Sequence, residues 1–423
     1  MKPLFIISSP YDTYSGYGAR SRDVIKAIVE TDKYDVKLIS QRWGNTPFGF
    51  CKDNPEWSFL LDLSIPLPLK IQPEIWAQIT VPNEFQPVGK YNIGITAGIE
   101  TTITPGGWIE GCNKMDLILT SSEHSKSVFL SSEFEKRIEN KILEKIKLET
   151  PIEILFEGAN TDVYKVTNKP CSIDIDIKES FAYLFVGHWM EGDLGEDRKN
   201  AGLLVKAFLE TFKNKNKKPA LIMKTSQVGS SYMDRDSILH KIKLIKGTID
   251  SDDLPNIYLL HGDFTDDEMN EIYNHNKIKS MVSLTKGEGF GRPLLEFSLS
   301  KKPIIATGWS GHMDFLKKEY NIILGGQLTN VHKSVKNEFL LKEAQWFSPN
   351  HVEIGNSLQL VFKDYKKYQV LGKRQGYYSK ENFSWDNMKS LLSSILEKYI
   401  PEFPKEISLT LPKINIPKLE KNG

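Results

Sequence analysis

The sequence predicts an α/β protein made of two doubly wound domains in tandem. The chain has 423 residues, about two to three times the length of a typical domain, so two hydrophobic cores are expected. Short apolar runs alternate with helical patterns or loops, as in a largely parallel sheet. The alternation lapses into polar residues at positions 160–176, which include Asn-Lys-Pro, and then resumes. Two domains imply a cleft between them.

The first half of the chain predicts one Rossmann-like domain over residues 1–170. Its short apolar runs predict strands at residues 4–8, 35–40, 58–63, 92–96, 116–120 and 153–156. Segment 21–30 places its valines and isoleucines on one helical face, as expected for a helix that packs on a sheet. The first βα unit therefore stands at the beginning of the domain.

The second half predicts another Rossmann-like domain over residues 171–384. Strands are expected at residues 183–186, 220–224, 257–260, 280–284, 303–306 and 322–324, with helices at 201–212 and 266–273. The remaining segment, 385–423, begins with an amphipathic helix at 385–399 that could cross back to the first domain. It ends in a Pro- and Lys-rich tail whose prolines argue against a regular helix.

Composition and charge exclude several classes of protein. Apolar residues make up 40% and charged residues 26%, which is ordinary for a globular protein. The net charge of +1 gives no strong field of the kind that marks nucleic-acid or membrane binders. Three widely spaced cysteines suggest neither disulfides nor a zinc site, and no apolar window is long enough for a membrane helix or signal peptide. We therefore expect a cytoplasmic protein.

Residues 286–296 form the most informative motif, Lys-Gly-Glu-Gly-Phe-Gly-Arg-Pro-Leu-Leu-Glu. Its three glycines allow a tight backbone close to a ligand, and Pro293 suits the first residue of a helix. A helix beginning there would point its positive end at an anion, while Glu288 and Glu296 could bind hydroxyl groups. The pattern indicates a site for a nucleotide sugar, although glycine-rich turns before helices also occur without function.

Three further places carry candidate ligand contacts. Residues 15–18, which read Ser-Gly-Tyr-Gly, follow the first strand, where backbone can approach a phosphate. This loop resembles the dinucleotide pattern G-x-G-x-x-G without a clear nicotinamide partner site, so a dehydrogenase is the weaker interpretation and a plain turn is the alternative. Lys224 ends a predicted strand and could point into the cleft or into solvent. Arg198 and Lys199 precede a predicted helix, where cations are electrostatically unfavourable without a function.

Together these motifs resemble those of the family-4 glycosyltransferases of the GT-B fold, in which two Rossmann-like domains face each other across a cleft. Glu288 and Glu296 reproduce the family's Glu-x7-Glu motif, and the match continues through residues 302–307 and Gly311. The resemblance implies that Glu288 holds a hydroxyl of the donor sugar and that Glu296 binds the ribose. It also implies that the amides of Phe290 and Gly291 contact the sugar or phosphate.

The resemblance assigns the remaining site residues as well. It implies that Arg198 and Lys199 contact the diphosphate and that, with Glu288, they form the catalytic group. The donor-binding residues would be Gly16, Tyr17, Gly18, Lys224, Gly289, Phe290, Gly291, Arg292 and Glu296. Residues 94–130 look like the first-domain signature of one subgroup, which makes Glu100 and His124 candidates for acceptor contact. The family often has an arginine where this chain has His188, so the likeness is weaker there.

The activity expected from this resemblance is retaining transfer of a hexose or pentose from a nucleotide sugar, with a UDP-sugar favoured. No Asp-x-Asp pair ends an apolar strand, so we expect a metal-independent reaction that needs no cofactor besides the donor. A glycan, a lipid-linked sugar and hydroxymethylated DNA all stay open as acceptors, although the net charge does not indicate nucleic acid. The alternatives are an epimerase or phosphorylase on the same fold, or a non-catalytic sugar-binding protein.

Overall fold

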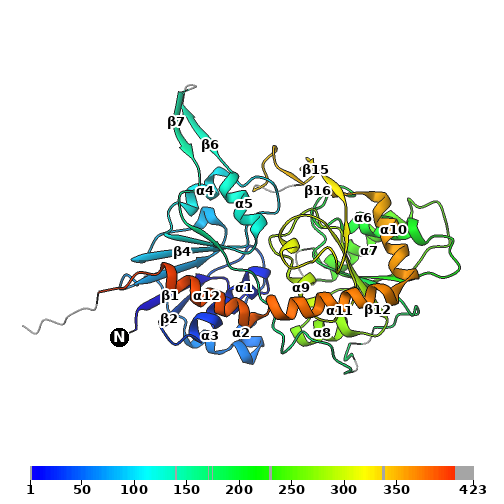
Figure 1. Ribbon diagram of the computed structural model, residues 1–423, viewed down its shortest axis with the longest axis horizontal. Coiled ribbons are helices and arrows are strands. Elements are labelled where there is room, and N and C mark those ends of the chain that lie inside the picture. Colours follow the sequence, from blue (N-terminus) through cyan, green and yellow to red (C-terminus); the bar gives the residue numbers. More distant parts are fainter. Residues whose placement is uncertain are drawn as a thin grey trace, which may run out of the picture.

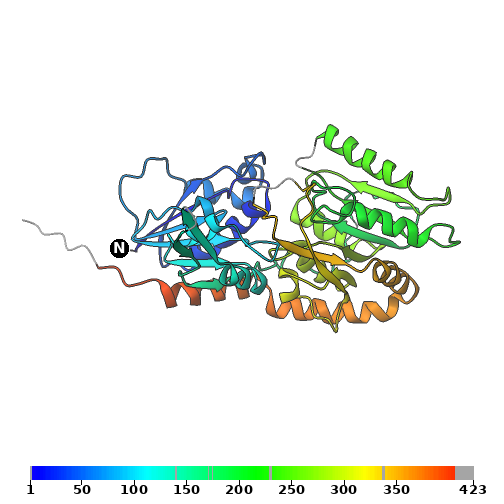
Figure 2. The ribbon, with the colours of Figure 1, turned by 90° about the horizontal axis from the view of Figure 1, so that it is seen from above.

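The computed structural model describes residues 2–138, 141–169, 171–173, 175–227, 231–335 and 339–404. The Pro- and Lys-rich tail lies outside the described residues from position 405 onwards. Two α/β lobes lie side by side, each built around a six-stranded sheet (Figures 1 and 2). The α/β fold predicted from the sequence is therefore confirmed.

The first lobe contains a parallel sheet whose strands run in the order β2-β1-β3-β4-β5-β8. The strands are β1 (Leu4–Ser9), β2 (Asp35–Ser40), β3 (Ile75–Ile79), β4 (Tyr91–Thr96), β5 (Leu117–Thr120) and β8 (Ile152–Ile154). The helices include α1 (Gly16–Val29), α2 (Phe50–Asp53), α3 (Phe59–Asp62), α4 (Gly106–Cys112) and α5 (Glu123–Ser131). Hydrophobic clusters cover both faces of this sheet, which is why its central strand β3 is buried along its whole length.

The second lobe repeats this plan with the strand order β11-β10-β9-β12-β13-β14. The strands are β9 (Ala182–Val186), β10 (Ala220–Lys224), β11 (Ile257–Leu260), β12 (Ile278–Ser283), β13 (Ile304–Thr307) and β14 (Ile322–Leu324). The helices include α6 (Ala201–Phe212), α7 (Tyr232–Lys246), α8 (Asp266–Asn274), α9 (Arg292–Ser298), α10 (His351–Lys363) and α11 (Tyr365–Asn382). Because all strands are parallel, their carboxyl ends meet at one edge of the sheet.

Two hairpins extend beyond these sheets, and neither was predicted. Strands β6 (Phe134–Ile138) and β7 (Lys141–Ile146) project from the first lobe (Figure 1). Strands β15 (Gly326–Asn330) and β16 (Gln345–Pro349) belong to the second lobe. After β15 the chain reaches the first lobe, where the ring of Phe339 packs on Trp108 at a centroid distance of 5.7 Å. The second hairpin therefore links the lobes.

The chain passes from the first lobe to the second near Ala159 and returns near Phe383, and these two crossings are hydrogen-bonded to each other. The Ala159 amide donates to the Phe383 carbonyl at 3.0 Å, and the Trp385 amide donates to the Ala159 carbonyl at 2.8 Å. Gly158 is required there, because a Cβ at this position would lie 2.6 Å from the Trp385 Cα. After the second crossing, helix α12 (Trp385–Tyr399) packs on α1 of the first lobe. Figure 2 shows α11 and α12 end to end along one side of both lobes.

Helix α12 has the amphipathic pattern expected from its sequence. Ser384 caps its first turn by accepting a hydrogen bond from the Asn387 amide, and Met388 and Leu392 are buried in the same cluster as β1 and α1. The division of the chain at residues 170 and 384 stays a prediction. The structure places α12, the last helix within residues 339–404, against the first lobe.

The predicted strand at residues 58–63 is wrong. This segment forms the one-turn helix α3, in which Leu60 is fully buried and Leu61 is 41% exposed. A run of six residues is too short for periodicity to separate a helix from a strand. The strand that completes the sheet is instead β3, which lies between β1 and β4 and was not predicted.

We predict that Leu392→Ala lowers the free energy of unfolding by about 2–5 kcal/mol, because it leaves a cavity where α12 meets the first lobe. Urea unfolding followed by circular dichroism measures this change. Leu360→Ala is the control, since Leu360 is 47% exposed on α10 and its truncation should cost no more than about 0.5 kcal/mol. Equal effects of the two substitutions would contradict the packing of α12.

Candidate functional site

The loop between β12 and α9 lies at the carboxyl edge of the second sheet. Gly291 has a φ of 97°, in the left-handed region that favours glycine, and Pro293 stands in the first turn of α9. A Cβ on Gly291 would lie 2.9 Å from the Cβ of His312. The Gly-Arg-Pro sequence therefore produces a sharp turn followed at once by a helix, as predicted. The side chain of Phe290 is buried and packs on Phe315.

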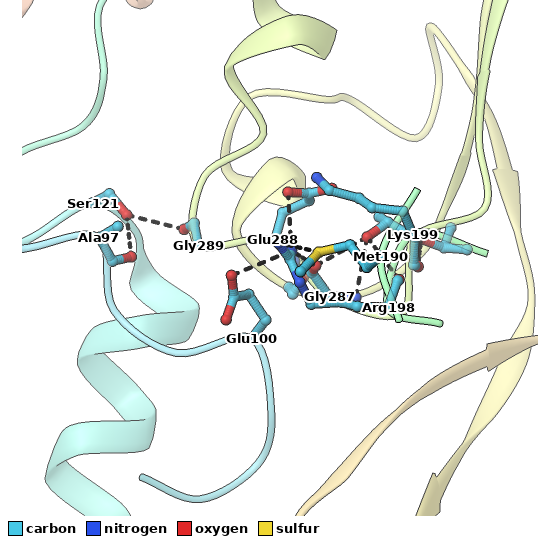
Figure 3. Close-up of polar contacts among 12 residues, drawn as sticks. Ala97, Glu100, Ser121, Met190, Arg198, Lys199, Gly287, Glu288 and Gly289 are labelled. Atoms are coloured by element: carbon cyan, nitrogen blue, oxygen red, sulfur yellow. Dashed lines mark hydrogen bonds and ion pairs between the residues drawn. The ribbon is translucent and has the colours of Figure 1, made fainter. Parts of the chain in front are cut away.

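Three charged side chains meet beside this loop, as shown in Figure 3. The Lys199 ammonium donates to Glu288 Oε1, and Arg198 Nη1 lies 3.6 Å from Glu288 Oε2. Arg198 Nη1 also donates to the Gly287 carbonyl at 2.9 Å and lies 3.2 Å from Glu100 Oε1 of the first lobe. The structure therefore brings together all three predicted catalytic residues and one predicted acceptor residue.

The segment before α6 holds the basic pair against the loop. Asn200 adopts a left-handed conformation with φ 52°, and its side-chain amide donates to the Leu284 carbonyl at 2.7 Å. The amide of Lys286 donates to the Arg198 carbonyl, also at 2.7 Å. Since both segments follow strands of one sheet, β9 and β12, these bonds fix the basic pair relative to Glu288.

The electrostatics of the cluster keep Glu288 ionised. Burial raises the pKa of its carboxyl, but Lys199 and Arg198 more than offset this and bring the pKa to about 2. Burial lowers the pKa of Lys199, and the charge of Glu288 opposes that shift. The carboxylate can therefore only accept hydrogen bonds at neutral pH, as a group that binds sugar hydroxyls should.

Glu296 has the opposite electrostatic environment. It lies in α9 with 7% of its surface exposed, and its Oε1 accepts a hydrogen bond from Arg292 Nε at 2.7 Å. Burial raises its pKa to about 7; the nearby Arg292 lowers the pKa, and Asp266 raises it further. The Tyr273 hydroxyl lies 3.5 Å from the other carboxylate oxygen. The two glutamates of the motif thus have different partners and different pKa values.

The first lobe closes directly on the glycines of the loop. A Cβ on Gly287 would lie 2.1 Å from the Glu100 carbonyl oxygen, and one on Gly289 would lie 2.5 Å from the Ala97 carbonyl oxygen. The Ser121 hydroxyl donates to the Ala97 carbonyl at 2.7 Å and also contacts the Gly289 carbonyl oxygen at 3.1 Å (Figure 3). These glycines are required where the two lobes meet.

This closure leaves little empty space beside Glu288. The cavity that Lys199, Glu288 and Gly291 line has a volume of about 10 Å³, whereas small-ligand sites usually enclose roughly 300–1,000 Å³. A larger cavity of about 640 Å³ lies elsewhere and is lined by residues that include Asn168 and His275, with none of the predicted site residues. A nucleotide-sized ligand therefore requires the lobes to move apart.

The glycine-rich loop of the first lobe forms the start of α1. Ser15 caps the helix by accepting a hydrogen bond from the Gly18 amide at 2.9 Å, and a Cβ on Gly18 would lie 2.4 Å from the Thr13 carbonyl oxygen. Gly18 thus has a structural reason to be glycine, and its amide is not directed at a ligand. Gly16 faces open space. The Tyr17 hydroxyl accepts a hydrogen bond from the Ala97 amide at 3.1 Å, next to the lobe contact.

The remaining two predicted residues lie farther from Glu288. Lys224 stands at the carboxyl end of β10, with its ammonium 5.4 Å from the centroid of the Phe264 ring. His124 packs edge-on against Trp309 of the second lobe at a centroid distance of 4.6 Å. Burial lowers the pKa of His124 to about 4, so its imidazole is neutral at physiological pH. The structure does not bring His124 to the charged cluster.

Ser121 and Asp23 are among the residues that contact the site but were not predicted. Ser121 directly follows β5, so the rule that ligands bind at the carboxyl ends of strands could have identified it. Asp23 lies within α1 and forms an ion pair of 2.6 Å with Arg292 of the second lobe. Nothing in the sequence pattern of α1 marks Asp23, because its partner is 269 residues away.

Within the described ranges, neither a cluster of metal ligands nor a membrane-spanning helix occurs. No group of three or more His, Cys, Asp or Glu side chains in this part of the chain is placed to hold a metal ion. None of its helices has the length and apolar character needed to cross a membrane.

No protein-family model matches the chain, and a comparison with curated proteins gives no match. Solved structures do match its fold. A glycosyltransferase from Rickettsia africae matches with a TM-score of 0.60 and 12% identity, over 94% of this chain and 99% of that one. Sucrose-phosphate synthase from Thermosynechococcus elongatus gives 0.59 and 11%, with the same coverage. HepE from Anabaena, solved with UDP and glucose, gives 0.55 and 11%, over 94% and 100%. The likeness confirms the predicted GT-B fold.

We predict that Glu296→Gln flattens the dependence of stability on pH. The folded protein holds the Glu296 proton up to a pH of about 7, whereas the unfolded chain releases it near the ordinary value of 4.5. The free energy of unfolding should therefore fall as pH rises between these values, by on the order of 1–3 kcal/mol for this group. Urea unfolding at pH 5, 6 and 7.5 measures the slope.

The matched control is Glu319→Gln, which changes an exposed glutamate of the same lobe. The free energy of unfolding of this variant should change with pH as much as that of the unchanged protein does. If that of Glu296→Gln also changes as much, Glu296 does not release its proton in the pH range assigned to it.

Proposed function

We propose that the protein is a glycosyltransferase that moves a sugar from a nucleotide diphosphate sugar, with a UDP-sugar favoured, to a hydroxyl acceptor. The observation that carries this proposal is the buried cluster of Glu288, Arg198 and Lys199 at the carboxyl edge of the second sheet of a GT-B fold. Solved structures with this fold include HepE with UDP-glucose and the trehalose-6-phosphate enzyme of E. coli with UDP-2-fluoro glucose.

The cluster has the charges that a nucleotide sugar needs. Arg198 and Lys199 supply two cations in a buried setting, where their attraction to a diphosphate is stronger than in water. In the closed structure these cations are paired with Glu288. A diphosphate that enters between the lobes would take over the two cations, and the ionised Glu288 would then accept hydrogen bonds from hydroxyls of the donor sugar.

The same pair supports a reaction without a bound metal. As the bond between the sugar and the diphosphate breaks, negative charge develops on the departing phosphate, and Arg198 and Lys199 can stabilise it as a divalent cation would. We propose that the anomeric configuration is retained and that the departing phosphate takes the proton of the acceptor hydroxyl. The protein then has to orient the donor and acceptor and exclude water.

The acceptor would approach from the first lobe. Glu100 reaches the cluster through Arg198, and the neutral His124 borders the lobe contact beside Trp309. We propose Glu100 as an acceptor contact, with His124 as a more distant one. The candidate acceptors are glycans, lipid-linked sugars and hydroxymethylated DNA. The division into an acceptor domain (1–170), a donor domain (171–384) and a C-terminal segment (385–423), and a cytoplasmic location, belong to the same proposal.

We predict that one nucleoside diphosphate raises the melting temperature of the protein. A ligand that binds only the folded state stabilises it by about 2.7 kcal/mol at one hundred times its dissociation constant. Thermal unfolding with UDP, GDP and ADP, each alone and as its sugar conjugate, measures the shift, and UDP should give the largest. If none of these nucleotides shifts the melting temperature, the proposed function is wrong.

We predict that Glu288→Gln and Lys199→Met each slow the transfer reaction by at least about 100-fold, the usual cost of losing one charge-stabilising group. The rate of UDP release from the UDP-sugar that binds in the thermal screen measures this effect. Glu381→Gln, at an exposed position of α11, should keep the full rate. Unchanged rates in both site variants would remove the cluster from the mechanism, and an epimerised sugar product would indicate the alternative enzyme class.

A further inference from the structure

Two consecutive buried ion pairs connect the lobes at Glu296, the second glutamate of the motif. Arg292 Nε donates to Glu296 Oε1 at 2.7 Å, and Arg292 Nη1 donates to Asp23 Oδ2 at 2.6 Å. Arg292 and Glu296 belong to α9 of the second lobe, while Asp23 belongs to α1 of the first. One guanidinium therefore joins a predicted ribose-binding carboxylate to a residue of the opposite lobe.

The three side chains are shielded from solvent. Their exposed fractions are 18% for Arg292, 11% for Asp23 and 9% for Glu296. The surroundings favour a charged guanidinium, since Asp23, Glu296 and Asp266 together hold the pKa of Arg292 above its ordinary value despite burial. Breaking one contact in such a setting would leave a buried charge without its partner, which is costly. The ion pairs should therefore hold these three side chains firmly in their observed arrangement.

The guanidinium groups of α1 itself, those of Arg20 and Arg22, donate to backbone carbonyls of the first half of the chain. Arg20 donates to the backbone carbonyls of Leu155 and Phe156, at the first crossing between the lobes. Arg292 therefore carries the link between Glu296 and Asp23, and it does so through different nitrogens of one rigid plane. Asp23 fixes the orientation of that plane, and the plane fixes Glu296.

Both oxygens of the Glu296 carboxylate have one partner and keep further acceptor capacity. Arg292 Nε donates to Oε1 at 2.7 Å, and the Tyr273 hydroxyl donates a long hydrogen bond of 3.5 Å to Oε2. An oriented carboxylate with an available oxygen suits a ribose hydroxyl. If the guanidinium turned away, both the position and the ionisation of this carboxylate would change, because burial alone disfavours its charge.

We propose that Asp23 is a positioning residue of the donor site: from the first lobe it holds Arg292, which orients Glu296 for the ribose hydroxyls of the nucleotide. One residue that supports the donor site then comes from the first lobe. This inference rests on the proposed function and adds to it a residue outside the Glu-x7-Glu motif.

The test compares two probes, UDP and 2′,3′-dideoxy-UDP, by isothermal titration calorimetry. In the unchanged protein, loss of the ribose hydroxyls should weaken binding roughly 10- to 100-fold, as for hydrogen bonds to a charged group. The measured quantity is the ratio of two dissociation constants, that of the dideoxy probe over that of UDP. In Asp23→Asn this ratio should fall about fivefold or more, because a poorly oriented Glu296 forms weaker hydrogen bonds to the ribose hydroxyls. A merely structural role for Asp23 would weaken both probes equally and leave the ratio unchanged, which would overturn the proposal.

Asp314→Asn is the matched control. Asp314 Oδ2 accepts a hydrogen bond of 2.9 Å from the Glu123 amide, so this variant also removes a charge from a contact between the lobes, away from Glu296. It should keep the ratio of the unchanged protein. If Asp314→Asn lowers the ratio as much as Asp23→Asn does, lobe closure in general is responsible and the proposal fails.

Two further outcomes separate this inference from the proposed function. If Asp23→Asn does not fold, as circular dichroism would show, Arg292→Lys takes its place, since a lysine cannot make both contacts and should lower the ratio as well. Equal binding of UDP and the dideoxy probe by the unchanged protein would overturn the inference while leaving a donor site in place. Absence of binding of any nucleoside diphosphate would overturn both.

Discussion

The rest of the structure depends on the contact between the glycine loop of the second lobe and the strand ends of the first. At Gly287 and Gly289 the backbone of one lobe lies so close to carbonyl oxygens of the other that no side chain fits. This contact brings Glu100 to Arg198, and Arg198 to Glu288. The charged cluster is therefore a product of lobe closure as well as of the local motif.

Two glutamates eight positions apart have different chemistry because their neighbours differ. Glu288 lies beside two cations and stays ionised, whereas Glu296 is buried beside one cation and near a second acid. The same helix and loop thus offer a fixed negative charge at one end and a carboxylate that protonates near neutrality at the other. Such a pair suits a ligand that has different groups along its length.

The sequence predicted the parts of the molecule that local chemistry determines. Eleven of the predicted strands needed only apolar runs, and the turn at Gly291 needed only the Gly-Arg-Pro order. Helix α3 was mistaken for a strand because its apolar run is too short to show a period. Asp23 could not be predicted, since its role depends on a partner brought near by the packing of two lobes. The structural role of Gly18 likewise depends on a contact with Thr13.

The paired crossings at Ala159 and Phe383 have a mechanical consequence. Because the two segments are hydrogen-bonded to each other and lie side by side, they act as a double-stranded hinge and not as two independent tethers. Twisting one segment against the other would break these bonds, whereas bending both together would keep them. The lobes should therefore open by bending about these two paired segments. Phe290 of the glycine loop packs beside Phe383 at this hinge, with ring centroids 6.5 Å apart, so the predicted donor site lies close to the axis of bending.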